Sequence, residues 1–163
     1  METILQEVEQ ALNARLYYLA IATALALPDI CAALESADGE TRPERYRDWY
    51  TANLAAKYPN LTAQDCYLLR CGILHQGRLG HPGSQYARVI FGLPGRGMTL
   101  HCTIVNDALQ LNALIFCRGV LASVRAWFAA HQNDPNVLAN YPNLVQYRPQ
   151  GLAPYGTGMP VIA

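Results

Sequence analysis

The sequence predicts a mainly α-helical bundle with an inserted β-hairpin and an extended, proline-rich C-terminal arm. Apolar residues recur at helical spacing in segments that begin with capping residues and end at proline or glycine. Apolar residues make up 52% of the 163 residues and charged residues 15%, which is a globular rather than a disordered composition. We expect one helical domain at residues 1–134, with a hairpin at about 86–105, and the arm at residues 135–163.

The first helix is expected to begin at the capping-box pattern Thr3-Ile4-Leu5-Gln6 and to end at Pro28. Its apolar stripe, at steps of three and four residues, consists of Leu5, Val8, Leu12, Leu16 and Leu19. The apolar run Leu16–Leu27 has twelve residues. A membrane-spanning helix needs about twenty, so this run indicates a buried core helix and no membrane segment. Asp29 is expected to cap a short helix over residues 30–35.

Two further helices have start signals of their own. Thr41-Arg42-Pro43-Glu44 is a second capping box and predicts a helix to about Lys57. Thr62-Ala63-Gln64-Asp65 predicts the start of a third helix, in which Asp65 lies favourably near the positive end. Gly77 is a natural residue just past the end of this helix, so His75 falls in its last turn.

A β-hairpin is predicted next, between the third helix and the longest one. Residues 86–93 are expected to form a strand, residues 94–97 a turn, and residues 98–105 the return strand. Asn106-Asp107 is then expected to cap a long, largely apolar helix that ends near His131.

The last 29 residues contain five prolines and three glycines, which predicts an extended arm with little regular structure. The arm also carries apolar side chains that a free linker would lack. These are Tyr141, Leu144, Val145, Tyr147, Leu152 and Tyr155. We therefore expect the arm to be ordered, lying across its own subunit or a neighbour.

Cysteine content and charge set limits on location and partners. Five cysteines without a Cys-x-x-Cys pair, and a first segment without basic residues, predict a reduced, cytoplasmic protein. The net charge is zero, but residues 1–65 carry −5 and residues 66–163 carry +5. The basic half has two interpretations: it attracts a polyanion, or it pairs with the acidic half inside one fold.

The segment Arg70-Cys71-Gly72-Ile73-Leu74-His75 places a guanidinium and an imidazole at the end of an apolar helix. A guanidinium presents a fork of donors that suits a phosphate, and histidine exchanges protons near neutral pH. An arginine followed by a histidine after four or five residues also occurs at Arg96/His101 in the predicted hairpin and at Arg125/His131 in the last helix. Arg70 and His75 would point about 140° apart on a straight helix, so a single copy need not bring them together.

At Arg70 and His75, and in its helix order over residues 1–131, the chain resembles the HEPN family (higher eukaryotes and prokaryotes nucleotide-binding domains). The resemblance implies a four-helix bundle that dimerises, so that two motifs face one cleft. It implies an endoribonuclease that needs no metal or cofactor, with Arg70 and His75 as catalytic residues and 2′,3′-cyclic phosphate products. Such domains act as toxins, with a partner antitoxin, or in phage defence. Tyr67, Gln76 and His81 are the candidate residues for binding RNA.

Other interpretations stay open. One is a helical dimer that binds a nucleotide, RNA or a protein without catalysis, which Cys71 favours because the family usually has a polar residue there. Another is a purely structural oligomer, in which the arm at residues 135–163 wraps a neighbour. A buried Arg70 paired with an acid such as Asp65 or Asp107 would favour this alternative. A metal site made of Cys71, His75 and His81 has no standard ligand spacing.

Overall fold

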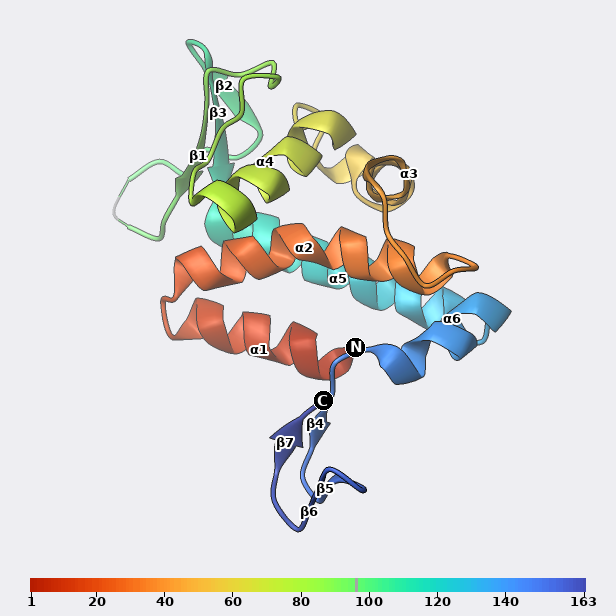
Figure 1. Cartoon of the computed structure of the whole chain (residues 1–163). Coiled ribbons are helices and arrows are strands. Elements are labelled where there is room, and N and C mark those ends of the chain that lie inside the picture. Colours follow the sequence, from red (N-terminus) through yellow and green to blue (C-terminus); the bar gives the residue numbers. More distant parts are fainter. Residues whose placement is uncertain (96) are drawn as a thin grey trace.

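The computed structural model describes residues 1–95 and 97–163, and it is mainly α-helical, as the sequence predicts. The helices are α1 (Glu2–Asn13), α2 (Tyr17–Glu35), α3 (Pro43–Asn53), α4 (Ala63–Gln76), α5 (Ala113–His131) and α6 (Pro135–Asn140), with short 3-10 helices η1 (Ala55–Lys57) and η2 (Tyr141–Asn143). The strands are β1 (Arg88–Gly92), β2 (Thr103–Val105), β3 (Ala108–Asn112), β4 (Tyr147–Arg148), β5 (Gly151–Leu152), β6 (Gly156–Thr157) and β7 (Val161–Ile162). Figure 1 shows α2 and α5 along the middle of the molecule, with α1 on one side and α3 and α4 on the other.

Helix α2 is the central element, packed against α1, α3, α4, α5 and α6. Among residues 17–34 the only charged side chain is that of Asp29, so the helix is apolar on every face and needs cover on every side. Helices α2 and α5 are long and apolar enough to span a membrane by length and composition alone. In the structure, 56% and 44% of the residues in their most apolar windows are buried within the protein.

The single helix predicted from Thr3 to Pro28 is wrong, because the chain reverses at residues 14–16. Arg15 has a φ of +61° there, and α1 and α2 pack side by side as a helical hairpin. Leu16 and Leu19, predicted to continue the apolar stripe, are 51% and 55% exposed. The hairpin is favoured physically because it covers one face of α2, which a single long helix would leave in water.

Pro28 does not end a helix, and residues 30–35 are not a separate helix, since α2 runs on to Glu35 with Pro28 inside it. Proline removes one helical hydrogen bond, but Pro28 is buried and its packing offsets that cost. Asp29 is therefore not a cap. Asp29 is instead a residue within α2, well before its end, and its carboxylate can bind side chains of neighbouring helices.

The three predicted helix starts have different outcomes. Thr3 does not cap the first helix, because α1 already begins at Glu2 and has no side-chain cap. Thr41 does not cap α3; its hydroxyl donates to Asp29 Oδ1 at 3.3 Å, and α3 ends at Asn53 rather than near Lys57. The predicted start of α4 is confirmed, because Thr62 Oγ1 accepts from the Asp65 N–H at 3.1 Å. Its predicted end is confirmed too: Gly77 adopts a left-handed conformation with φ +63°.

The predicted hairpin of residues 86–93 with 98–105 is wrong. Strand β1 pairs in parallel with β3, and β2 pairs antiparallel with β3, giving the order β1-β3-β2. The tight turn falls at Asn106-Asp107, where Asn106 has a φ of +55° that asparagine tolerates in hairpin turns. Helix α5 begins later, capped by Asn112, whose Oδ1 accepts from the Ile115 N–H at 3.0 Å. Arg96, in the predicted turn, lies outside the described residues.

His101 joins the sheet to the helical core. Its Nδ1 accepts the Asn112 N–H at 3.2 Å, and its ring lies edge-on to Tyr58 with centroids 5.8 Å apart. Burial lowers the pKa of His101 below 6.5. Protonating this ring breaks the hydrogen bond at the start of α5.

The His101→Gln substitution is expected to reduce the stability lost on acidification. Because the folded-state pKa is lowered, the unfolded chain binds more protons than the folded protein below about pH 6.5, and stability falls as pH drops through the folded-state pKa. Thermal melting at about pH 7.5 and about pH 5.5 should show a smaller decrease in Tm for the variant than for wild type. Equal decreases would contradict this role.

The C-terminal segment is more regular than the predicted arm. Helix α6 packs against α2, with Val137 buried, and Tyr141 stacks on Phe128 with ring centroids 5.4 Å apart. Asn140 Nδ2 donates to the carbonyls of Ala33, Leu34 and Ser36 at 3.3, 3.1 and 2.7 Å, which completes the C-terminal end of α2. Residues 145–163 instead form small β-hairpins that project from the bundle (Figure 1).

Two truncations are expected to separate these parts of the C-terminal segment. Ending the chain after Asp134 removes the buried Val137 and the Asn140 cap, and should cost about 3 kcal/mol from lost burial and hydrogen bonds. Ending it after Leu144 leaves both in place and should change the Tm of the monomer little. Thermal melting of both proteins tests this, and equal Tm values for the two would contradict it.

Candidate functional site

Arg70 and His75 meet on the surface of α4, although a straight helix points them apart. Arg70 Nη1 lies 3.1 Å from His75 Nε2, because the long guanidinium side chain reaches along the helix toward the last turn. A guanidinium has donors only, so His75 Nε2 accepts this hydrogen bond and the imidazole is neutral, with its proton on Nδ1. His75 is exposed, and the pair is therefore open to a ligand.

Asp29 is a third member of this cluster, which sequence reasoning missed. Its Oδ2 accepts from Arg70 Nε at 2.5 Å, so the carboxylate ties α2 to α4. The exposed fractions of the two side chains are 20% for Arg70 and 11% for Asp29, so water screens the pair only in part. The available signal was that Asp29 is the lone acid in the apolar stretch 17–34, where a charge is rarely buried without a partner.

The electrostatics of the cluster follow from its burial. Loss of hydration raises the pKa of Asp29, and the Arg70 guanidinium only partly opposes this. Burial also works against the charged form of Arg70, but the Asp29 carboxylate outweighs it and raises the arginine pKa. The Asp29–Arg70–His75 cluster is thus a charged guanidinium held at Nε, with further N–H groups directed toward His75 and solvent.

The other predicted site residues lie around this cluster at different depths. Tyr67 packs edge-on against Tyr46, with centroids 5.4 Å apart, and burial together with a hydrogen bond to the Cys71 thiol raises its pKa. Cys71 Sγ is 4.0 Å from Arg70 Nη1. Gln76 is exposed on the last turn of α4, and His81 is partly exposed in the following loop.

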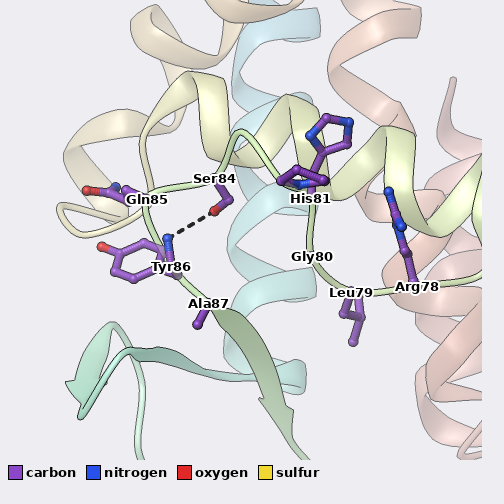
Figure 2. Close-up of a pocket in the computed structure, with 9 residues that line it drawn as sticks. Arg78, Leu79, Gly80, His81, Ser84, Gln85, Tyr86 and Ala87 are labelled. Atoms are coloured by element: carbon purple, nitrogen blue, oxygen red, sulfur yellow. Dashed lines mark hydrogen bonds between the residues drawn. The ribbon is translucent and has the colours of Figure 1, made fainter.

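The loop 78–87 folds back onto α4 just beyond His75 and lines an open surface hollow of about 360 Å³ (Figure 2). Gly72 makes the close approach possible, since a Cβ there would lie 2.7 Å from the Arg78 carbonyl oxygen. His81 Nδ1 accepts the Gly83 N–H at 3.2 Å inside the loop. These contacts fix the shape of the hollow, which lies beside the cluster and is lined by Arg78 and His81 among other residues.

Asp65 anchors the far side of this loop. Its carboxylate accepts from Thr62, from the Ser84 hydroxyl at 2.8 Å, and from the Gln85 backbone and side-chain amides at 3.0 and 2.6 Å. Burial works to raise the pKa of Asp65, but these hydrogen bonds prevail and lower it. Asp65 is thus committed to the loop and does not pair with Arg70, which binds Asp29 instead of the predicted Asp65 or Asp107.

A metal centre finds no support in this geometry. Within residues 1–95 and 97–163, no three His, Cys, Asp or Glu side chains form a group that could hold a metal ion, and Cys71, His75 and His81 form none. The cluster offers instead a cation and a neutral imidazole, which suit binding of a phosphate and transfer of a proton. Comparisons with family models, curated proteins and solved structures find no match to this chain.

Proposed function

We propose that this protein is a metal-independent endoribonuclease of the HEPN type, acting as a cytoplasmic toxin or phage-defence protein with an antitoxin partner. The observation that carries the proposal is the 3.1 Å contact between Arg70 Nη1 and His75 Nε2, with Asp29 behind the arginine. It supports the proposal because a phosphate-binding cation and a neutral base are present within reach of one phosphodiester.

The reaction follows from the roles of these groups. When RNA binds, Arg70 Nη1 turns from His75 to the scissile phosphate and frees the lone pair of His75 Nε2. His75 Nε2 then takes the proton of a ribose 2′-hydroxyl, the 2′-oxygen attacks the adjacent phosphorus, and the bond to the 5′-oxygen breaks. The products are a 2′,3′-cyclic phosphate and a 5′-hydroxyl, whose proton comes from a protonated His75 in the second copy of the motif, so the reaction begins with one neutral and one protonated His75 in the dimer. Arg70 stabilises charge on the phosphate oxygens, while Asp29 holds the guanidinium by Nε and leaves its Nη groups for the phosphate.

A homodimer is part of the proposal, and exposed apolar side chains at the motif end of the bundle support it. Leu16 is 51% exposed, Tyr18 57% and Leu74 42%. They gather at one end, since the Tyr18 hydroxyl donates to the Ile73 carbonyl at 3.2 Å and so links α2 to the end of α4. Covering this surface with a second copy would place two motifs close to one cleft.

The Leu16→Glu substitution is expected to convert the dimer to a monomer and to abolish cleavage without unfolding the protein. A carboxylate would desolvate at the interface, whereas in the monomer Glu at the N-terminal end of α2 interacts favourably with the helix dipole. Sedimentation at tens of micromolar and thermal melting measure both properties. A wild-type monomer, or an active monomeric variant, would contradict the composite site.

The function itself is tested by incubating wild-type protein with a mixed-sequence RNA in a chelating buffer. Cleavage without added metal is expected. An absence of cleavage, or cleavage only after a divalent metal is added, would contradict the proposal.

Cys71 favours a second candidate, a helical dimer that binds RNA, a nucleotide or a protein without catalysis, and the Asp29–Arg70 ion pair also favours a purely structural oligomer. In that case the ion pair is an interhelical tie, and Cys71 stands where catalysis would favour a polar residue. Arg70→Met would then lower the Tm, and wild-type protein would bind RNA without cutting it. Parallel binding and cleavage assays distinguish the two candidates.

A further inference from the structure

The loop 78–87 is held more firmly than a plain connection requires. At one end, the Arg78 N–H donates to the Gly72 carbonyl at 3.1 Å, and the backbone lies against Gly72 where no Cβ intervenes. At the other end, the buried carboxylate of Asp65 binds Ser84 and Gln85. Figure 2 shows the two limbs of the loop facing each other across the hollow. A site whose walls are fixed in advance loses little entropy when a ligand binds.

The residues that line the hollow include one guanidinium, that of Arg78, and no carboxylate, although the Asp65 carboxylate accepts from Ser84 and Gln85 behind the lining. Residues 66–95 contain three arginines and two histidines and no carboxylate. Arg70 is paired with Asp29, whereas the structure shows no ion pair for Arg78 or Arg88 within residues 1–95 and 97–163. An unpaired guanidinium on the rim of a polar hollow is suited to a phosphate oxygen.

His81 adds a second donor at the same place. Its Nδ1 accepts the Gly83 N–H, so the neutral ring carries its proton on Nε2, which is not used inside the loop. Figure 2 shows the Arg78 and His81 side chains on the same side of the loop, with Leu79 on the other.

We infer that the hollow of residues 78–87 is an RNA subsite, which binds the nucleotide next to the scissile phosphate and holds its phosphate with Arg78 and His81. The inference rests on the proposed function, because the loop begins three residues after His75 and folds back onto the last turn of α4. An RNA strand that presents one phosphodiester to Arg70 and His75 would pass its neighbouring nucleotide to this loop.

Binding of a single-stranded, fully 2′-O-methylated RNA oligonucleotide tests the subsite, because this probe cannot be cleaved. Arg78→Ala should weaken binding about tenfold and lower the slope of log affinity against log salt by about one. His81→Asn keeps an oxygen to accept the Gly83 N–H, but its shorter side chain has no donor at the position of Nε2, and it should weaken binding about threefold. Ala87→Leu should also weaken binding, by filling the hollow without changing charge.

Arg47→Ala is the matched control, since Arg47 is an arginine on α3 that hydrogen-bonds Gln64 and lies outside the hollow. It should bind the probe like wild type. Wild-type affinity in both Arg78→Ala and Ala87→Leu, or an equal loss in Arg47→Ala, would overturn the subsite.

Different experimental results would contradict the proposed subsite and the proposed cleavage reaction. If the wild-type protein binds the probe through Arg78 but cuts no RNA, the proposed cleavage is wrong and the subsite stands. If RNA is cut in a manner that depends on Arg70 and His75, and Arg78→Ala leaves both probe affinity and KM unchanged, the cleavage stands and the subsite is wrong.

Discussion

Arg70→Ala and His75→Ala proteins are each expected to lose RNA cleavage by about 100-fold or more, the range over which a general base or a charge-stabilising group contributes to rate. In the proposed reaction, Arg70→Ala removes the cation that binds the phosphate, and His75→Ala removes the base. His75 is exposed, and Arg70 contributes one partly exposed ion pair, so the helical fold should persist in both. Cleavage of mixed-sequence RNA in chelating buffer measures the effect, with circular dichroism as the check on folding.

Arg125→Ala and His131→Ala are the matched controls, because these residues have the same type of spacing on α5 but bind elsewhere. Arg125 pairs with Glu2 at 3.0 Å, and His131 Nδ1 contacts the Trp127 carbonyl at 2.9 Å. Both variants should cut RNA at the wild-type rate. Full activity in Arg70→Ala or His75→Ala would remove that residue from the catalytic assignment.

Gly119→Ala is expected to destabilise the protein by about 2 kcal/mol and to lower its Tm by several degrees. Helix propensity alone predicts the opposite sign, since alanine is about 1 kcal/mol better than glycine in a helix. A Cβ at position 119 would lie 2.1 Å from the Tyr58 hydroxyl oxygen. Tyr58 is 2% exposed and donates to the Phe116 carbonyl at 2.9 Å, so it has no room to move without losing that bond.

The Tyr58→Phe background supplies the control for Gly119→Ala. Without the hydroxyl, the nearest remaining ring atom is Cζ, 3.2 Å from the added Cβ, and the cost of alanine should shrink by about 1 kcal/mol or more. Thermal or denaturant unfolding of the four proteins measures the coupling. A higher Tm for Gly119→Ala than for wild type would contradict this packing.

Local signals predict local structure well in this chain. Both ends of α4 could be predicted, because its cap and its terminating glycine act within a few residues of each end. The division of the first predicted helix into α1 and α2 could not be predicted, since Leu16 and Leu19 continue the apolar spacing of α1. Only the need to cover α2 favours a reversal of the chain at that point. The strand order β1-β3-β2 likewise depends on pairing between segments far apart in sequence.

In the candidate site, too, local features could be predicted from the sequence and long-range contacts could not. Arg70 and His75 were identified from residue types and spacing, but their contact depends on the side-chain conformation that the Asp29 carboxylate holds. Asp29 lies 41 residues before Arg70, and no pattern in one sequence connects positions so far apart. Pro28 directly before it favoured a helix cap, and that local interpretation concealed a buried acid in the middle of α2.

The chemistry of the cut RNA ends is the sharpest test of the proposed cleavage reaction. Wild-type protein is incubated in chelating buffer with a defined RNA, and with the same RNA carrying a single 2′-deoxynucleotide at the cut position. Attack by the 2′-oxygen should give a 2′,3′-cyclic phosphate and a 5′-hydroxyl from the first RNA, and no cut at that position in the second. A 3′-hydroxyl and a 5′-phosphate, or cleavage at the deoxynucleotide, would contradict it, because neither passes through attack by a 2′-oxygen.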